Sequence, residues 1–439
     1  MDEIDRSIAQ HRTAKATVTL THQGAPVANR ELTVAQQSHK FLFGANWGHR
    51  SNALDHQHDS NTALANASAL INWDHSSIAL ANGELSGAEK ELAEKHHAQF
   101  IALCNQVTLP FYWGGFETIR GQPQTDRLLT AARWFKDQGC VVKGHPLCWQ
   151  TVTADWLLPL SNAAILEAQL ARIEREVGDF AGVIDTWDVI NEAVIMPVYD
   201  KYDNGITRIA RELGRIELIR RLFEAAHAAN PKATLLINDF DTSSAYDILV
   251  EGCLAAGIQI DVIGIQSHMH KGYWGVEKTQ KVISHFERFG LPIHFTENSF
   301  LSGHLVPPEI NDLQDYMVEE WPSTPQGEAR QLKQVLTHYK TLLAHPAIQS
   351  ITWWDMSDGA WLNAPAGLLR RDQSPKPAYE ALLSLVKGDW WLSPTRMSTD
   401  EAGTLGFSGF LGDYRLSVDG TDVSISLDQS GEVNLSVAL

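Results

Sequence analysis

The alternation of short apolar runs with longer amphipathic stretches constrains this fold more than any other sequence feature. Eight apolar runs are expected to be β-strands, and each is followed by a helix-like segment, such as residues 207–229 and 326–343. The eight runs are 41–44, 100–103, 141–144, 184–190, 235–237, 262–265, 293–295 and 351–354. Near-continuous apolar strands separated by helices indicate a parallel sheet, and eight of them can close into a barrel. The sequence therefore predicts an α/β fold, a (β/α)8 barrel.

Both ends of the chain contain short alternating strands separated by Gly and Asp turns. Neither end can bury the face of a sheet alone, and chain termini often lie close together. We therefore expect the two ends to form one small β-sandwich-like accessory module, with a Trp390–Trp391 pair plugging its junction with the barrel. The expected division is 1–37 for the N-terminal strands, 38–388 for the barrel and 389–439 for the C-terminal strands.

Charge and hydropathy exclude several classes of protein. The chain has 53 acidic and 35 basic side chains, a formal net charge of −18. This balance argues against nucleic acid as a partner and against a polybasic membrane-surface role. The apolar runs are shorter than the roughly 18 residues that a membrane span needs. No signal peptide is visible, so we expect a cytoplasmic protein as written, or a secreted one whose signal was removed. A monomer is expected.

Metal and disulfide chemistry find little support in the sequence. Four cysteines form no CxxC pair and are interpreted as free thiols: Cys104, Cys140, Cys148 and Cys253. Three close histidine pairs suggest metal sites at first sight: His56 with His58, His96 with His97, and His268 with His270. An i,i+2 pair on a strand places its two side chains on opposite faces, which disfavours ligation. We therefore expect no metal and no organic cofactor.

Polar residues follow almost every predicted strand, where the strands of such a barrel open into the active site. They are Asn105; His145 and Trp149; Asn191 and Glu192; Asn238 and Asp239; Gln266 and His268; Thr296 and Glu297; Trp354 and Asp358. Packing alone does not explain polar side chains at the ends of so many strands, because each one would be buried in an apolar layer without a partner. Asp239 and Asp358 are expected to have structural roles at the rim.

Glu192 and Glu297 stand out because each follows a strand directly and is preceded by a small polar residue. Two carboxylates flanking a cleft are the minimum apparatus for cleaving a glycosidic bond: one stays protonated as the acid, and the other is ionised and attacks the anomeric carbon. Mutual repulsion separates the two pKa values. From spacing alone, two ordinary helix-start glutamates remain the alternative.

Several motifs in the same order resemble glycoside hydrolase family 10, the endo-1,4-β-xylanases. The motifs lie at residues 144–149, 187–193, 236–240, 263–268, 295–297 and 351–361, followed by 367–369 and 375–379. They cover the chain from about Phe43 to Leu383. The segment 187–193, Trp-Asp-Val-Ile-Asn-Glu-Ala, is similar to the acid/base signature of that family. The chain is thus identified as a divergent member.

The resemblance implies a retaining hydrolase of β-1,4-linked xylan or xylo-oligosaccharides that acts by double displacement. It implies that Glu192 is the acid/base, Glu297 the nucleophile, and Asn191 a hydrogen-bond partner of the sugar 2-OH. His145, Gln266 and His268 would line the same subsite, with His268 or Gln266 orienting Glu297. Three tryptophans would form the walls that stack on sugar rings: Trp149, Trp354 and Trp361.

Three positions depart from the family pattern. Tyr112 stands where the family usually has a Lys, in a segment two residues shorter; Ser299 replaces an Asp two residues after the nucleophile; and Gln150 replaces a His. We expect Phe111 and Tyr112 to offer aromatic stacking to the glycone instead of a charged donor. Two other readings stay open: a relative acting on another β-linked oligosaccharide or plant glycoside, and a carbohydrate-binding protein without catalysis.

Overall fold

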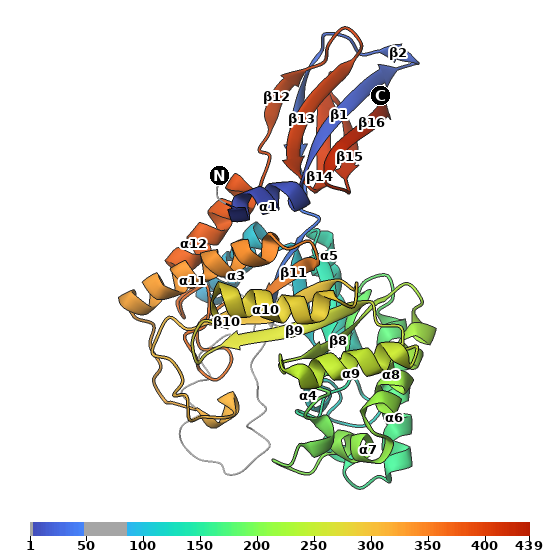
Figure 1. Ribbon diagram of the computed structural model, residues 1–439, viewed down its shortest axis with the longest axis vertical. Coiled ribbons are helices and arrows are strands. Elements are labelled where there is room, and N and C mark those ends of the chain that lie inside the picture. The colour runs from blue at the N-terminus through green and yellow to red at the C-terminus, as the bar shows by residue number, and fades with distance from the viewer. Residues whose placement is uncertain (1–2, 48–85) are drawn as a thin grey trace.

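The computed structural model describes residues 3–47 and 86–439, and it shows a closed barrel with a two-sheet module at one end (Figure 1). His56 and His58 lie outside the described residues. The eight barrel strands are parallel and are ordered β10-β11-β4-β5-β6-β7-β8-β9. Their bounds are β4 (Leu42–Asn46), β5 (Gln106–Pro110), β6 (Val141–His145), β7 (Thr186–Asn191), β8 (Thr234–Asp239), β9 (Val262–Met269), β10 (Ile293–Phe300) and β11 (Ile348–Trp353). The predicted (β/α)8 barrel is confirmed.

Helices cover the outside of the barrel. They are α3 (Gly87–Leu103), α4 (Trp113–Phe116), α5 (Thr125–Asp137), α6 (Asn162–Asp179), α7 (Gly205–Leu213), α8 (Arg215–Ala229), α9 (Ser244–Ala255), α10 (Gly275–Glu287), α11 (Pro325–Leu343) and α12 (Pro377–Ser384), with the short turns η3 (Asp155–Leu157), η4 (Met196–Val198), η5 (Leu313–Asp315) and η6 (Leu385–Asp389). Side chains of Ser161, Asn204 and Thr324 accept the first free N–H groups of α6, α7 and α11, as N-cap residues do. In the described part of the chain, no helix is long and apolar enough to cross a bilayer.

Two predicted elements differ in the structure. The run 100–103 is not the second strand but the last turn of α3; it is apolar because Phe100 packs edge-on against Phe135, with ring centroids 5.3 Å apart. The second strand is β5, so Asn105 precedes a strand instead of following one. Its amide bonds the backbone oxygens of residues 39 and 41 at the base of the barrel, away from the mouth. The predicted helix 207–229 is broken by Gly214, whose φ of 75° is left-handed.

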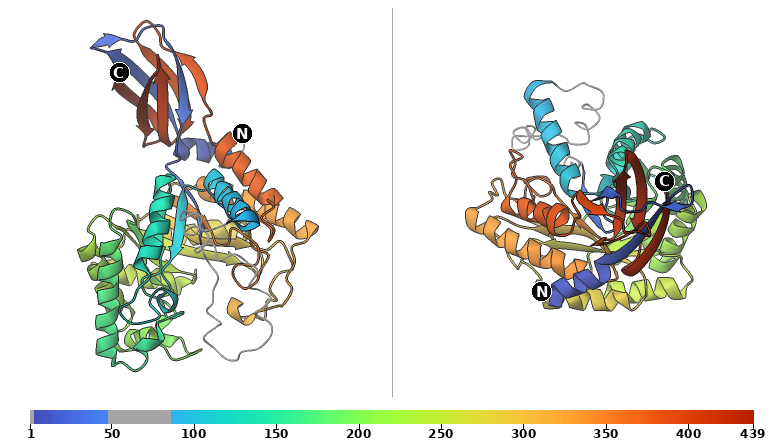
Figure 2. Two further views of the ribbon diagram at one scale, coloured as in Figure 1. Left: turned by 180° about the vertical axis from the view of Figure 1, so that it is seen from behind. Right: turned by 90° about the horizontal axis from the view of Figure 1, so that it is seen from above.

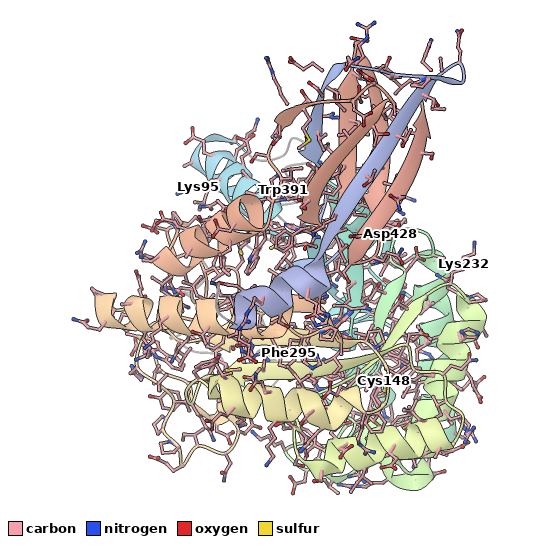
Figure 3. The ribbon with its side chains drawn as sticks, turned by 45° about the horizontal axis from the view of Figure 1, so that its top comes forward. Lys95, Cys148, Lys232, Phe295, Trp391 and Asp428 are labelled. Carbon is pink, nitrogen blue, oxygen red and sulfur yellow. The ribbon has the colours of Figure 1, made fainter. Side chains whose placement is uncertain are left out.

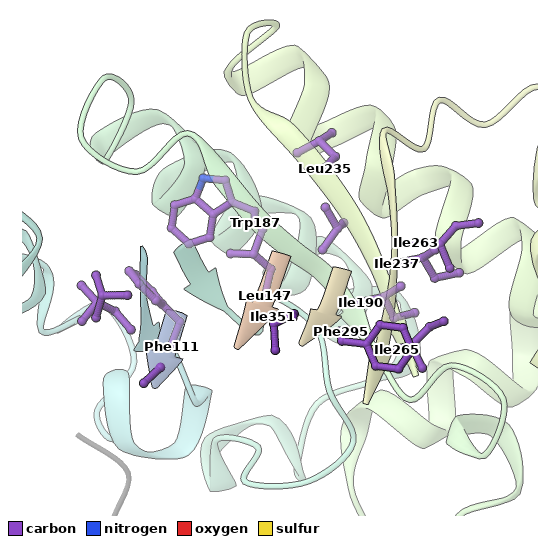
Figure 4. Packing of buried hydrophobic residues seen from close by; sticks show 14 of the residues in the cluster. Phe111, Leu147, Trp187, Ile190, Leu235, Ile237, Ile263, Ile265, Phe295 and Ile351 are labelled. Atoms are coloured by element: carbon purple, nitrogen blue, oxygen red, sulfur yellow. The ribbon is translucent and has the colours of Figure 1, made fainter. Parts of the chain in front are cut away.

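Large apolar side chains fill the space between the strands and the helices (Figure 4). Trp187 in β7 is fully buried and lies over β6 at Gly144. A Cβ at Gly144 would stand 2.1 Å from the Trp187 ring. Glycine is therefore required at this point of β6, directly before His145, because the indole occupies the place of a side chain.

The accessory module consists of two four-stranded sheets from both ends of the chain. One sheet has the order β13-β1-β16 with β2 paired to β1, and the other has the order β12-β3-β14-β15. The strands are β1 (Thr13–His22), β2 (Ala25–Pro26), β3 (Glu31–Gln36), β12 (Thr395–Ser398), β13 (Thr404–Phe410), β14 (Gly412–Val418), β15 (Thr421–Leu427) and β16 (Gly431–Ala438). β1 pairs antiparallel to β13 and parallel to β16. Alternating residues such as Val18, Leu405 and Leu416 form a separate core between the sheets, as in a β-sandwich.

The module sits at the base of the barrel, where the strands begin, as Figures 1 and 2 show. The chain leaves β3 and enters β4 within a few residues, and on this path His39 hydrogen-bonds the backbone oxygen of Val386 at 2.7 Å. Trp391 packs edge-on against His39 at the same junction (Figure 3). An additional helix, α1 (Glu3–Arg12), packs on α11 of the barrel. The expected division assigns residues 1–37 to the module, but α1 lies within this range and contacts the barrel. The division at residue 37 therefore stays a prediction.

Candidate active site

The two glutamates lie at the mouth of the barrel, on strands with irregular pairing. Glu192 follows β7 directly, and Glu297 lies within β10. The register between β7 and β8 shifts between Asp188 and Ile190, and the register between β10 and β9 shifts between Phe295 and Glu297. A bulge of this kind re-aims the side chain that follows it. Both carboxylates therefore depend on local departures from regular strand geometry.

Glu192 is held by its backbone as well as by its side chain. Its φ of 59° is left-handed, which is uncommon for a residue other than glycine, and its N–H donates to the Asn238 carbonyl oxygen at 2.8 Å. The Gln150 amide donates to Glu192 Oε2 at 2.9 Å. Burial and, to a smaller extent, the charge of Glu297 raise the pKa of Glu192 to about 7, while the Trp149 indole opposes the rise.

Glu297 is buried and has a donor on each oxygen. Asn238 Nδ2 donates to Oε1 at 2.9 Å, and His268 Nε2 lies 2.9 Å from Oε2. Burial raises the pKa of Glu297 to about 7, while His145 and Lys143 oppose the rise. Two acids with pKa values near neutrality that interact electrostatically titrate as a pair. Glu297 has two donors at 2.9 Å, whereas Glu192 has one at 2.9 Å and two at 3.4 Å, and this difference favours the ionised form of Glu297.

Asn238 connects the backbone of Glu192 with the carboxylate of Glu297. Besides Glu297, its Nδ2 donates to Asn191 Oδ1 at 2.8 Å, and the same oxygen accepts from Gln266 Nε2 at 3.0 Å. Thr296 donates to Asn238 Oδ1 at 2.6 Å. The space for this amide comes from Gly264 in β9, where a Cβ would stand 2.4 Å from Asn238 Oδ1.

His268 is placed between Glu297 and Ser299. Its Nε2 faces Glu297, and its Nδ1 lies 3.1 Å from Ser299 Oγ. Burial lowers the pKa of His268 to about 3, so the imidazole is neutral at neutral pH. A neutral imidazole has one donor nitrogen. Because the Glu297 carboxylate can only accept, the proton belongs on Nε2, and the Ser299 hydroxyl donates to Nδ1.

A buried ion cluster lies beneath the mouth. Asp188 Oδ2 is 2.7 Å from Lys143 Nζ and 2.6 Å from His145 Nδ1. Burial by itself would raise the pKa of Asp188, but Lys143 and His145 together hold it below its usual value. Asp188 binds Nδ1 of His145 and thereby fixes the orientation of the imidazole, so that Nε2 points away from Asp188.

Aromatic rings surround the carboxylate pair. Trp354 lies 5.3 Å from His145 and 5.8 Å from His268, and Trp361 lies 4.5 Å from His268, all between ring centroids. Tyr112 lies 5.6 Å from the Trp149 ring. Burial raises the pKa of the Tyr112 hydroxyl well above its usual range, and the next largest causes are the charges of Glu297 and Asp355.

The expectation that Phe111 stacks on a sugar is wrong. Phe111 has no exposed surface, and its ring packs against Phe116, Phe180 and Trp187. Phe111 and Tyr112 are neighbours in an extended segment, and successive side chains there point to opposite sides. Only Tyr112 therefore faces the mouth.

Two further carboxylates at the mouth have structural partners. Asp239 accepts the N–H groups of Val194 and Asp241 at 3.0 and 2.9 Å. Asp358 lies 2.6 Å from Lys376 Nζ. Across residues 3–47 and 86–439, no group of three or more His, Cys, Asp or Glu side chains is arranged to hold a metal ion.

The structure brings together all ten residues that the sequence predicted for the site. They are Glu192, Glu297, Asn191, His145, Trp149, Gln266, His268, Trp354, Trp361 and Tyr112, and their individual roles stay predictions. Sequence reasoning missed Lys143 and Asp188 as contributors. Their signal was a charged residue in the middle of each of two apolar strands; a buried charge requires a partner.

Comparison with known proteins supports the resemblance. Residues 74–385 match the family described as Glycosyl hydrolase family 10. The chain is 27% identical over 315 residues to endo-1,4-beta-xylanase A of Caldicellulosiruptor sp. (strain Rt8B.4), covering 66% of this chain and 43% of that protein. It is 28% identical over 291 residues to endo-1,4-beta-xylanase A of Cellvibrio japonicus (strain Ueda107), covering 60% of this chain and 47% of that protein. The chain thus spans less than half the length of these two relatives.

Solved structures show the same fold. Native xylanase 10B from Thermotoga maritima superposes with a TM-score of 0.57 at 19% identity, covering 79% of this chain and 96% of that one. A GH10 structure from Paenibacillus barcinonensis gives a TM-score of 0.59 at 19% identity, covering 79% and 95% of the two chains.

Proposed function

Because the chain belongs to glycosyl hydrolase family 10, we propose that it is a retaining glycoside hydrolase that cleaves β-1,4-linked xylan or xylo-oligosaccharides. The observation that carries this proposal is the carboxylate pair. Glu192 and Glu297 both have pKa values raised to about 7, and their hydrogen-bond donors differ. A protonated and an ionised carboxyl group side by side are what double displacement needs.

In the first step, Glu297 Oε attacks the anomeric carbon while Glu192 gives its proton to the leaving oxygen. The leaving sugar departs as an alcohol, and a glycosyl ester forms on Glu297. In the second step, Glu192, now ionised, takes a proton from water, and the resulting hydroxide equivalent displaces Glu297. Formation of the ester removes the negative charge of Glu297, and with it one of the causes that raise the pKa of Glu192. Glu192 thereby changes from acid to base.

The surrounding amides and rings position the substrate. Asn191 Oδ1 accepts from Asn238 and Gln266, and Asn191 Nδ2 donates one N–H to Glu192 Oε1 at 3.4 Å, which leaves its second N–H for a ligand. We assign Asn191 Nδ2 to the sugar 2-OH, where hydrogen bonds strengthen towards the transition state. Trp149, Trp354 and Trp361 supply apolar faces for the sugar rings.

A second candidate substrate class is another β-linked oligosaccharide or plant glycoside. Tyr112 favours it, because a phenol sits at the mouth in place of a cationic side chain; burial, followed by the charges of Glu297 and Asp355, raises the pKa of this phenol well above its usual range. A carbohydrate-binding protein without catalysis has less support, since both carboxylates keep their donors.

The test is hydrolysis of a chromogenic aryl xylobioside beside the matching β-glucoside and β-galactoside. We expect the xylobioside to be preferred and the first product to have the β configuration by NMR. A 2-fluoro xylobioside should label the peptide that contains Glu297, with Glu297→Gln as the unlabelled control. An α product, or a label on Glu192, would contradict the assignment. A preference for the glucoside or galactoside would move the substrate to the second class.

A further inference from the structure

An ion bridge joins two long loops across the mouth of the barrel. Lys201 Nζ, in the loop between β7 and α7, lies 2.7 Å from Asp312 Oδ2 and 2.7 Å from Asp315 Oδ1. Both aspartates belong to the loop between β10 and α11, where Asp312 is the N-cap of η5 and Asp315 is its last residue. Strands β8 and β9 lie between β7 and β10 in the closed barrel. The bridge therefore spans the β8 and β9 side of the mouth.

Each of the two loops is also anchored elsewhere. Arg211 of α7 donates to the backbone oxygens of residues 197 and 199 at 2.8 and 3.3 Å. Asn363, between β11 and α12, donates to the backbone oxygens of residues 318 and 319 at 3.1 and 3.0 Å. An exposed ion pair contributes little when mobile chains must be ordered to form it. Because both loops are anchored, the bridge loses less of its free energy to this ordering.

The electrostatics of the bridge keep its lysine charged. Burial by itself would lower the pKa of Lys201, but hydrogen bonds and charges of Asp312 and Asp315 raise it above its usual value. Lysine in this setting stays protonated throughout the neutral range. The bridge is therefore present at the pH at which Glu192 and Glu297 work.

The same loop forms a wall of the space beside the nucleophile. Leu313, between the two aspartates, lines a cavity of about 480 Å³ whose wall also includes His268, the partner of Glu297. Pockets of this size hold small molecules. On the other side of the bridge, Lys201 follows Glu192 shortly along the chain. The bridge thus ties the loop that follows the acid/base to a loop that bounds the space next to the nucleophile.

We propose that this bridge closes the end of the cleft that receives the leaving group, so that the protein accepts only a short leaving group and cuts glycan chains next to their reducing end. This inference rests on the proposed function and adds the position of the cut. Glu192 protonates the leaving oxygen, so the leaving group lies on the Glu192 side, where the arc of strands from β7 to β10 begins. Tyr112 lies after β5 and Trp354 after β11, on the opposite arc, where the glycone is expected.

The test identifies the bond that is cut in xylohexaose, by mass spectrometry of the products formed in heavy-oxygen water. We expect the wild type to release mainly xylose from the reducing end. Lys201→Met should raise the ratio of internal to terminal cuts about three- to tenfold, which is the range for partly exposed ion pairs. On an aryl xylobioside, whose leaving group is short, the variant and the wild type should have equal rates.

A matched control and a charge exchange separate the bridge from the bulk of the lysine. Arg288→Met removes a cation that binds Asp247 and Glu251 of α9 on the outside of the barrel, and it should leave the cutting pattern unchanged. Lys201→Asp should open the end further than Lys201→Met, because three carboxylates then face one another. Lys201→Asp/Asp312→Lys should restore the terminal cut. Added salt should shift the wild type, but not Lys201→Met, towards internal cuts.

The outcomes distinguish this inference from the proposed function. If the wild type hydrolyses the aryl xylobioside but cuts xylohexaose evenly or from its non-reducing end, the function stands and the inference is overturned. An unchanged pattern in Lys201→Met overturns it as well. If the wild type hydrolyses only another β-glycoside, the xylan assignment fails, and the same comparison is made with the oligosaccharide of that sugar. A terminal cut that Lys201→Met loses there supports the bridge, and one that it keeps refutes it.

Discussion

The two ends of the barrel use polar side chains in opposite ways. At the base, Arg12 donates to the backbone oxygens of residues 343, 345 and 348, at 2.8, 2.5 and 2.7 Å, and these bonds join α1 to the start of β11. At the mouth, the buried polar side chains bond mainly to one another, as Asn238 does with Asn191 and Glu297. His270 is buried directly after β9, and neither of its ring nitrogens has a hydrogen-bond partner among the described residues.

This difference separates stability from function. At the base, Arg12 donates to three backbone oxygens, although burial lowers the pKa of its guanidinium to about 10. At the mouth, buried acids whose pKa values are raised to about 7 cost stability when they ionise. Shifted pKa values of this kind gather at functional sites. Substitutions at the mouth should therefore change rates with little loss of stability, and substitutions at the base should do the reverse.

The largest effect is expected from Glu297→Gln. The variant should lose about 10⁴-fold or more in kcat, because no glycosyl ester can form. Its Tm at pH 8 should equal or exceed that of the wild type. The folded-state pKa of Glu297 is raised to about 7, so ionisation destabilises the fold as pH rises from about 4.5 towards 7. At pH 4 the two proteins should melt together. A lower Tm at pH 8 would show that Glu297 is a structural residue.

Gly264→Ala tests whether the mouth depends on space as well as charge. The new methyl group would meet Asn238 Oδ1 and push the amide away from Glu297. A displacement of about 1 Å in an active site costs roughly 10²-fold in rate, so we expect kcat to fall by about that factor. Gly178→Ala in α6, where a Cβ meets nothing within 4 Å, is the control. Equal kinetics of the two variants would contradict the role given to Asn238.

Ser299→Ala should have a smaller effect at the same site. Without the hydroxyl, His268 Nδ1 loses its donor, and the tautomer that donates to Glu297 is less favoured. A neutral hydrogen bond contributes about 0.5–1.5 kcal/mol, so kcat should fall roughly two- to tenfold with KM little changed. Ser284→Ala on the exposed face of α10 is the matched control. A change in KM alone would place Ser299 in substrate binding instead.

Arg12→Ala should have the smallest effect on activity and the clearest effect on stability. Loss of charge-assisted hydrogen bonds at the base should cost about 1.5–3 kcal/mol of unfolding free energy, measured as a lower Tm, while kcat/KM stays unchanged. Arg415→Ala, on the module and well exposed, should change neither quantity. A fall in kcat/KM for Arg12→Ala in step with the Tm would show that the two ends of the barrel are coupled.

The sequence by itself determined the barrel, the glutamate pair and the terminal strands. A strand buried on both faces appears in the sequence as a short apolar run, and an amphipathic helix appears as apolar residues three to four positions apart. Both patterns can be recognised within a short stretch of sequence. Glu192 and Glu297 were recognisable because each follows such a strand within a motif. The run 100–103 was misassigned as a strand, since a short apolar run suits a strand and a buried helix end equally well.

The tertiary structure alone decided how these groups meet. The bulges before Glu192 and Glu297, the space that Gly264 leaves for Asn238, and the pairing of Lys143 with Asp188 arise between strands distant in sequence. Local propensity carries no information about them. The place of the accessory module at the base was likewise decided by contacts such as that of His39 with Val386. Residues 347 positions apart become neighbours only when the barrel closes.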